Sequence, residues 1–401
     1  MGELAGIPAR LRAEAIPLAK FNGGGHASAC IIKSVATKSE VSKHDRIRQT
    51  LTEAISSGEY QAGQRLPSES ELVKVFGASR PTVNRALREL QLSGIIDRRA
   101  GSGSYVRPDA VARGYVFGLL IPELGRTEIF EPICHGMAGA QNGSHHALLW
   151  GSSLEDSSNI EEQATQACRQ LVAKKVSGVF FAPLELTKEK DTTNLRLAEV
   201  FDKAGIPVVL LDRDLVSYPE RSHYDLVGID NRRAGYVITA HLLKAGCQRI
   251  VFIGRPGSAP TVDARMVGYK DALADAGSRF RAHIHRIEPD DHPAVKAILD
   301  KVRPDGFICA NDFTAAHLLK TLNKLGVSVP DEVRMTGIDD VKYASLLSVP
   351  LTTIHQPCAE MGAAAISTML ERVRNPTLPA RDILLNFRLV VRESSGGRKT
   401  R

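Results

Sequence analysis

The sequence lacks the features of membrane proteins and of disulfide-stabilised secreted proteins. No apolar run approaches the about 18 residues needed to span a bilayer, so we expect no membrane partner. The six cysteines form no Cys-x-x-Cys pair and no zinc-finger spacing, which favours reduced thiols in a hydrophobic core. The first 20 residues are interrupted by arginine, glutamate and lysine and have no hydrophobic signal core. These absences predict a cytoplasmic protein.

Motifs of common enzyme classes are also missing. The sequence has no phosphate-binding P-loop, no Gly-x-Ser-x-Gly nucleophile elbow, and no lysine beside an evident phosphate site that could form a Schiff base. The pairs His145-His146 and His283/His285 have no partners at metal-ligand spacing, and we interpret them as surface or strand residues. We therefore expect no catalytic residue, no metal and no cofactor.

Net charge is nearly absent from most of the chain. Of the 401 residues, those up to Arg113 include 17 basic and 11 acidic side chains, whereas the remaining 288 residues include 35 and 34. The chain is long enough for two or three domains. Because the basic surplus lies near the amino end, it favours a polyanionic partner for that part of the chain.

The region 66–106 begins with a predicted helix pair. Two short amphipathic segments flank Gly77-Ala78, and an apolar pattern from His44 to Ser57 predicts a supporting helix. One face of the second segment is apolar: Val83, Ala86, Leu87 and Leu90. The opposite face carries Pro81, Asn84, Arg85 and Arg88. A helix pair with basic and amide side chains outward has the geometry that enters a major groove.

A hairpin with a glycine-rich tip is predicted from Ile95 to Val106. Its tip reads Arg98-Arg99-Ala100-Gly101-Ser102-Gly103, and glycines beside arginines let the backbone approach a phosphate or a narrow groove. Each arginine alone is more simply explained as a solvated surface residue. The helix pair, the basic stripe and the basic hairpin nevertheless occur together within about forty residues, which predicts binding to double-stranded operator DNA.

The segments LPSESEL and SRPTVNRALRELQLSGII, followed by the glycine-rich hairpin, resemble the winged helix-turn-helix of the gluconate-repressor (GntR) family over about residues 43–107. With the basic stripe, the resemblance implies these operator contacts: Arg80, Thr82, Asn84, Arg85, Arg99, Gly101, Ser102 and Gly103. The chain departs from the family at Ser70 and Asn84, where arginine is common, so the operator sequence stays open.

Beyond residue 114, predicted strands alternate with predicted helices. Strands are predicted at 115–121, 146–150, 178–181, 207–211, 226–229, 250–253, 306–310 and 333–338. Helices are predicted at 130–142, 159–174, 191–204, 232–245, 260–276, 293–301 and 312–325. This succession predicts an α/β fold with doubly wound parallel sheets, and about 280 residues favour two lobes.

Polar side chains follow many of these strands, where doubly wound sheets bind ligands. They include Glu123, Asp212, Arg213, Asp214, Asp230, Asn231, Asn311, Asp312, Asp339 and Asp340, to which we add Arg265 and His355-Gln356. Converging carboxylates, amides and arginines can hold the hydroxyls of a polyol. Asp230 and Asn311, each taken alone, are more simply explained as caps of the following helices.

The segments YVFGLLIPE, PVVLLDRD, LVGIDNRRAGY, ARMVGYKDAL, ICANDFTAAHLL and PLTTIHQP resemble the effector domain of the lactose/galactose-repressor (LacI/GalR) family over about residues 115–393. That family's fold is similar to the periplasmic sugar-binding proteins. The resemblance implies two lobes with crossovers near 227–231 and 354–357. It also implies an effector cleft lined by Arg213, Asp230, Arg265, Asn311 and Asp339. Glu123 and Phe130 are further predicted contacts, although their loop departs from the family's usual Asn-Pro-Phe-Phe.

The two resemblances together predict a ligand-responsive repressor of carbohydrate-utilisation genes that binds operator DNA as a homodimer. The predicted organisation is a disordered tail (1–40), a winged helix-turn-helix domain (43–107), a linker (108–113), a two-lobed effector and dimerisation domain (114–395) and a short tail (396–401). Three alternatives stay open: a GntR-headed fusion with an enzyme-like body, a regulator that senses a nucleoside or purine, and a sugar-binding protein for uptake.

Overall fold

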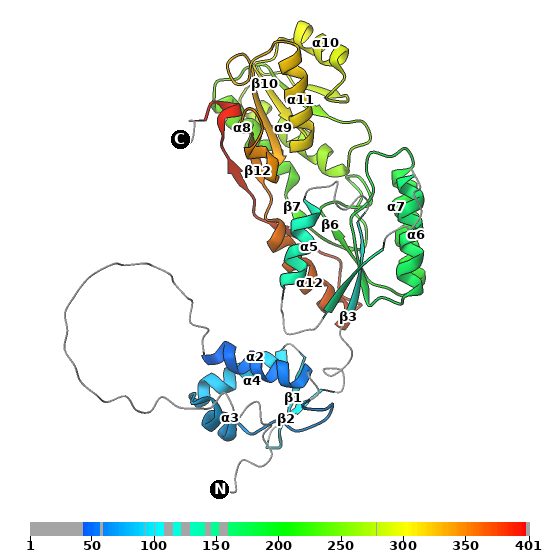
Figure 1. The fold of residues 1–401 in the computed structure, drawn as a ribbon, viewed down its shortest axis with the longest axis vertical. Coiled ribbons are helices and arrows are strands. Elements are labelled where there is room, and N and C mark those ends of the chain that lie inside the picture. The colour runs from blue at the N-terminus through cyan, green and yellow to red at the C-terminus, as the bar shows by residue number, and fades with distance from the viewer. Residues whose placement is uncertain are drawn as a thin grey trace, which may run out of the picture. The chain divides into compact units, whose positions relative to one another are not determined.

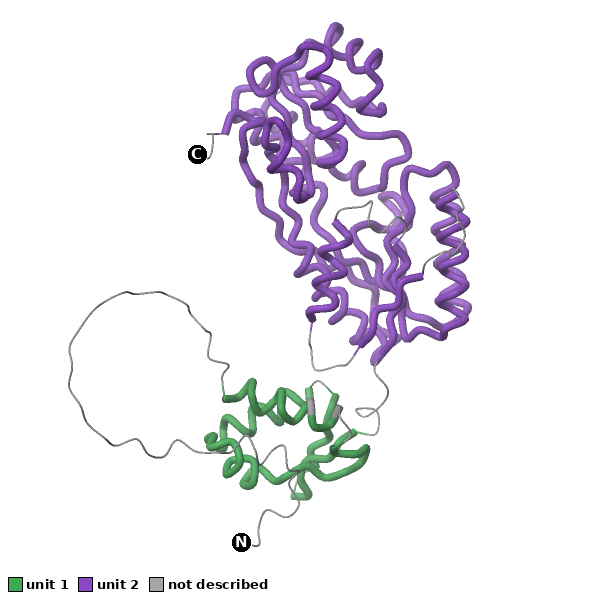
Figure 2. Tube along the Cα trace, viewed as in Figure 1, with its two compact units in different colours: residues 1–114, 141–145 green, residues 115–140, 146–401 purple. Residues whose placement is uncertain are grey.

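The computed structural model describes residues 43–56, 59–92, 94–99, 101–107, 115–121, 129–140, 146–151, 159–277 and 279–397. The chain forms two compact units, one of residues 1–114 with 141–145 and one of residues 115–140 with 146–401 (Figure 2). The predicted tail 1–40 and linker 108–113 lie outside the described residues. No helix in the described ranges is long and apolar enough to cross a membrane.

The first unit consists of a helical domain and a hairpin (Figure 1). Its described elements are α2 (Lys43–Ser56), α3 (Glu69–Phe76), α4 (Arg80–Leu92), β1 (Ile96–Arg99) and β2 (Gly103–Val106). Ser68 begins α3 through a capping box with Glu71, and Gly77, at φ +54°, turns the chain toward α4. The predicted apolar face of α4 is confirmed, because Val83, Ala86, Leu87 and Leu90 are buried in one core with α2.

The second unit contains two α/β lobes. The strands of the first lobe are β3 (Tyr115–Leu120), β4 (His146–Trp150), β5 (Gly178–Phe181), β6 (Val208–Leu211), β7 (Asp225–Ile229) and β13 (Asp382–Leu385). They form a parallel sheet in the order β13-β7-β6-β5-β3-β4. Helices α6 (Ile160–Ala173) and α7 (Lys190–Lys203) cover one face, and α5 (Phe130–Gly139) and α12 (Cys358–Arg374) cover the other (Figure 1).

The second lobe repeats this arrangement. Its strands are β8 (Ile250–Gly254), β9 (His283–Arg286), β10 (Gly306–Cys309), β11 (Arg334–Asp339), β12 (Thr352–His355) and β14 (Arg388–Val390). They follow the order β14-β12-β11-β10-β8-β9, and β14 is antiparallel to β12. Helices α8 (Asn231–Lys244) and α9 (Pro260–Asp275) pack on one face, and α10 (His292–Val302) and α11 (Asp312–Lys324) on the other.

The α/β class and the two-lobe arrangement are confirmed, but the connections between the lobes differ from the prediction. The chain crosses between lobes at 229–231 and 355–358, as expected, and again at 385–388, where β13 of the first lobe leads into β14 of the second. The sequence patterns did not predict this third crossover, nor the elements β9, β12, β13, β14 and α12.

Candidate DNA-binding surface and effector cavity

The outward face of α4 is the candidate surface for a DNA major groove. Arg80, Asn84, Arg85 and Arg88 are exposed on α4, and Thr82 is half-buried. The Ser79 hydroxyl accepts a hydrogen bond from the Thr82 N–H at 3.4 Å and so caps the first turn of the helix. The structure therefore presents the predicted stripe of basic and amide groups on one rigid element.

Three polar side chains join α3, α4 and the hairpin. Asn84 Nδ2 donates to Glu69 Oε1 at 3.2 Å, and Asn84 Oδ1 accepts from Arg98 at 3.4 Å. Arg98 also forms an ion pair with Glu69. Both ends of the Asn84 amide are thus hydrogen-bonded inside the domain, so Asn84 positions the hairpin against α4 whether or not it also contacts a base. We call these contacts among Glu69, Asn84 and Arg98 the joint. The sequence patterns placed Arg98 in the hairpin tip but did not reveal the joint.

The hairpin tip has the geometry of a wing. Gly101 and Gly103 adopt φ values of +73° and +116°, which side-chain-bearing residues rarely adopt. A Cβ added at Gly103 would lie 2.8 Å from Arg65 Nε, whereas a Cβ added at Gly101 would meet nothing within 4 Å. Arg99 lies over the Tyr105 ring at 4.8 Å, and Ser102 Oγ is hydrogen-bonded to the Tyr105 hydroxyl at 2.7 Å.

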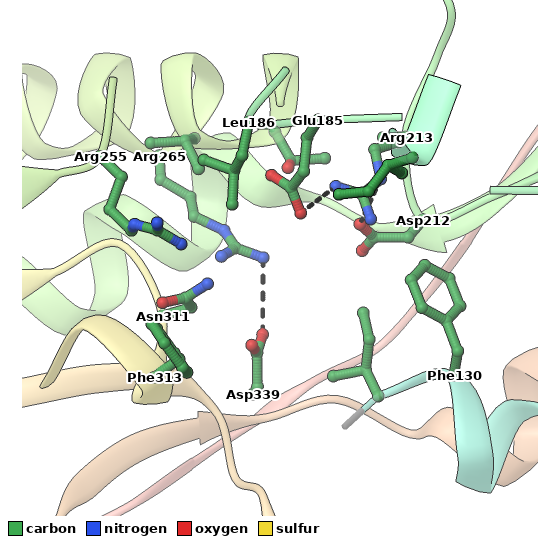
Figure 3. Close-up of a pocket in the computed structure, with 14 residues that line it drawn as sticks. Phe130, Glu185, Leu186, Asp212, Arg213, Arg255, Arg265, Asn311, Phe313 and Asp339 are labelled. Carbon is green, nitrogen blue, oxygen red and sulfur yellow. Dashed lines mark ion pairs between the residues drawn. The ribbon is translucent and has the colours of Figure 1, made fainter. Parts of the chain in front are cut away.

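The second unit contains a cavity of about 400 Å³, which is large enough for a small metabolite. The first lobe contributes Ile129, Phe130, Ile160, Glu185, Leu186, Asp212 and Arg213, and the second lobe contributes Arg255, Thr261, Val262, Arg265, Asn311, Phe313 and Asp339 (Figure 3). Its polar groups follow strand ends: Asp212 comes after β6, Asn311 follows β10, and Asp339 ends β11. This is the ligand position expected for doubly wound sheets.

On the first-lobe side, Arg213 is paired with two carboxylates. It forms an ion pair with Glu185, its Nε lies 3.7 Å from Asp212 Oδ2, and its guanidinium lies 5.5 Å from the Phe130 ring centre. Burial raises the pKa of Glu185, but the charge of Arg213 and its hydrogen bond more than offset this and hold that pKa below its usual value. Burial raises the pKa of Asp212 despite Arg213. Among the described residues, the buried atoms Arg213 Nε and Asp212 Oδ1 have no hydrogen-bond partner.

On the second-lobe side, Arg265 is fixed by three contacts. Its Nε donates to Asn231 Oδ1 at 2.8 Å, another guanidinium N–H donates to the Ala310 carbonyl at 2.6 Å, and a third nitrogen lies 3.7 Å from Asp339 Oδ1. Gln356 Nε2 donates to the same Asp339 oxygen at 2.8 Å. Burial raises the pKa of Asp339 to about 8, although Arg265 acts in the opposite direction. A dashed line marks the ion pair between Arg265 and Asp339 in Figure 3.

Comparisons with known proteins match two parts of the chain to two families. Residues 43–106 match the family described as bacterial regulatory proteins, gntR family, and residues 239–395 match the periplasmic binding protein-like domain. The chain is a GntR-headed transcriptional regulator. Its second unit is a periplasmic-binding-protein-like effector domain, so the alternative of an enzyme-like body is wrong.

Several proteins to which this chain is similar are named as transcriptional repressors or regulators. The arabinose metabolism transcriptional repressor of Geobacillus stearothermophilus is 26% identical and aligns over 88% of this chain and 97% of its own. The HTH-type transcriptional repressor PurR of Photobacterium profundum is 29% identical over 72% of this chain and 85% of its own. A solved complex of the transcriptional regulator CelR with cellobiose shares the fold, with a TM-score of 0.58 at 24% identity over 79% of this chain and 91% of that one.

The structure brings five of the seven predicted effector residues of the regulator to the cavity: Phe130, Arg213, Arg265, Asn311 and Asp339. Asp230 does not line it, and the prediction of its position is corrected. Its carboxylate accepts from the Arg233 N–H at 2.9 Å and caps α8, because Asp230 lies in the crossover between the lobes. Glu123 lies outside the described residues.

Asn311 combines both roles that the sequence left open. Its Oδ1 accepts from the Thr314 N–H at 2.9 Å and caps α11, while the residue also lines the cavity. Since the amide oxygen is used by the cap, the amide nitrogen is the group that remains for an effector.

Sequence reasoning did not assign several cavity residues. Arg255 directly follows β8, so the rule of polar strand ends would have found it, and it pairs with Glu288 at 2.8 Å. Glu185 lies four residues beyond β5, too far for that rule. Phe313 lies in the first turn of α11, where Arg255 stacks over it at 5.4 Å. No sequence pattern distinguishes this ring from a core residue.

Proposed function

We propose that the regulator is a repressor of carbohydrate-utilisation genes whose effector is an uncharged, polyhydroxylated molecule bound between the two lobes. The first unit would bind operator DNA through α4 and the wing. The named activities of the arabinose repressor and of the cellobiose-bound regulator support a sugar effector, and the cavity supplies the chemistry.

The pairing of charges in the cavity carries this proposal. Arg213 is paired with Glu185 and Asp212, and Arg255 with Glu288, while the guanidinium of Arg265 donates hydrogen bonds to Asn231 and to the Ala310 carbonyl. A phosphate or carboxylate ligand needs a cation that is not already neutralised, whereas hydroxyl groups can both donate to a carboxylate and accept from a paired guanidinium. Asp212 Oδ1 and Arg213 Nε are a buried acceptor and a buried donor without a hydrogen-bond partner among the described residues.

A nucleoside or purine is the second candidate effector. Phe130 and Phe313 line opposite sides of the cavity in Figure 3 and offer aromatic faces to a planar ring. The purine-repressor name of the Photobacterium profundum relative points the same way.

Thermal-shift screening of the full chain against pentoses, hexoses, disaccharides, uronates, sugar phosphates, nucleosides and purines tests the proposal. A neutral sugar at 100 times its dissociation constant should add about 2.7 kcal/mol of stability. The same compound should change operator affinity in fluorescence anisotropy. Its stabilisation should disappear in Arg213→Gln and persist in Arg232→Gln, whose arginine pairs with Asp271 outside the cavity. Preferential binding of anionic compounds would contradict the uncharged effector, and stabilisation by purines alone would select the second candidate.

A further inference from the structure

Two hydrogen bonds of the chain itself join the lobes at the cavity. The segment 185–186 belongs to the first lobe, between β5 and α7, and the segment 257–259 belongs to the second lobe, between β8 and α9. The Leu186 N–H donates to the Gly257 carbonyl at 2.8 Å, and the Ala259 N–H donates to Glu185 Oε2 at 3.1 Å. We call this pair of bonds the interlobe contact.

Glu185 belongs both to the interlobe contact and to the cavity wall. Its Oε1 forms the ion pair with Arg213, while its Oε2 accepts from the second lobe. Its side chain is 24% exposed, so both interactions are partly shielded from water. The Glu185 carboxylate therefore connects Arg213 of the cavity wall with the backbone of the opposite lobe.

The backbone around the interlobe contact also depends on the second lobe. Leu186 adopts a φ of +61°, a conformation that residues with a side chain rarely hold without support from their surroundings. Gly257, whose carbonyl accepts from Leu186, adopts φ +73°, a conformation that glycine holds without the strain that a side chain would add. The conformation of 185–186 is thus supported by groups that separate if the lobes separate.

We propose that Glu185 is the positioning residue that couples occupation of the cavity to closure of the lobes. A ligand that hydrogen-bonds to Arg213 fixes the guanidinium, the guanidinium fixes the Glu185 carboxylate, and the carboxylate fixes the Ala259 N–H of the second lobe. This inference rests on the proposed function only in assigning the cavity to an effector. The contact between lobes is a property of the chain and can be measured without any ligand.

Hydrogen–deuterium exchange of the full chain measures the interlobe contact directly, because both donors are backbone amides. In Glu185→Ala, exchange in peptides covering 183–189 and 256–262 should rise by about tenfold, which corresponds to about 1.4 kcal/mol of local opening. Peptides from the buried strands β6 and β10 should keep their wild-type protection. In Glu185→Gln, the amide oxygen can still accept from the Ala259 N–H. Exchange in the 183–189 and 256–262 peptides should therefore be intermediate between wild type and Glu185→Ala. Glu288→Gln, which removes a carboxylate paired within the second lobe, is the matched control and should leave the 183–189 peptide unchanged.

Wild-type protection of both peptides in Glu185→Ala would overturn the proposal. Faster exchange in β6 as well would also overturn it, since Glu185 would then support its own lobe. Neither exchange measurement requires an effector. A ligand screen that finds no effector would therefore count against the proposed function, whereas unchanged exchange in Glu185→Ala would count against the interlobe contact.

Discussion

Burial places Asp339 in an environment that disfavours its charged form. Burial raises its pKa to about 8, Arg265 partly opposes this, and Asp312 adds to it. An unfolded aspartate titrates near 3.9, so between about pH 4 and pH 8 the folded state binds more protons than the unfolded state. The free energy of unfolding should therefore fall as pH rises through this window.

Replacing Asp339 with asparagine tests this dependence. The stability of Asp339→Asn relative to wild type should increase from about pH 4 and level off above about pH 8, measured by urea unfolding at each pH. Asp312→Asn is the matched comparison, because burial raises the pKa of Asp312 only to about 6 and its difference should level off about two pH units lower. A stability difference for Asp339→Asn that does not change with pH would show that Asp339 is ionised throughout.

Two residues that occupy the same kind of position in the sequence, between a strand and a helix, have different roles in the structure. Asp230 and Asn311 both follow a strand and both cap the next helix, yet only Asn311 reaches the cavity. The difference arises because β7 leads into a crossover to the other lobe, whereas β10 leads into a helix of its own lobe. The alternation of strands and helices predicted the strand ends, but which ends face the cavity depends on contacts between distant segments.

At the scale of elements, the joint of Glu69, Asn84 and Arg98 orients the wing against α4. Electrostatics alone predicts that removing the Glu69 carboxylate strengthens binding to a polyanion. Loss of the joint predicts the opposite, because the wing is no longer held. We expect Glu69→Gln to weaken operator binding by about threefold to tenfold, which corresponds to the net contribution of about 0.5–1.5 kcal/mol of one typical hydrogen bond.

Anisotropy titrations at several salt concentrations separate the two effects. Asp97→Asn is the matched control, since Asp97 is an exposed carboxylate on the same strand as Arg98 and should leave affinity unchanged or raise it. Tighter operator binding by Glu69→Gln would refute the positioning role of the joint.

Three of the elements that the sequence failed to predict share a physical cause. β9, β13 and β14 are edge strands of three or four residues, and each is held by pairing with a distant segment. Asp382 of β13, for example, pairs in register with Leu226. By contrast, β5, β6, β8 and β10 are buried along their whole length, and their continuous apolar runs were recognisable. The winged domain was predicted most completely, because its helices are set by local periodicity and capping.

At the scale of the whole molecule, each chain supplies one winged domain, whereas a near-palindromic operator has two half-sites. We therefore propose that the regulator binds as a homodimer, with half-site centres separated by one helical turn of about 10 bp or a multiple of it. Light scattering at micromolar concentration should give about twice the mass of 43.5 kDa, with and without operator. A monomeric mass under both conditions would contradict the proposal.

Spacing variants of the operator test the geometry independently of mass. Inserting about 5 bp between the half-sites rotates one of them to the opposite side of the duplex, whereas inserting about 10 bp restores its face. A dimer should lose most of its affinity with the first insertion and recover part of it with the second, because only the second lets both winged domains bind together. Arg85→Ala should weaken binding at every spacing, and where both winged domains bind the factor should be about the square of the factor for one bound domain, since each domain loses the same contact. If the two insertions weaken binding equally, the winged domains bind independently, and the effector domain cannot act by setting the distance between them.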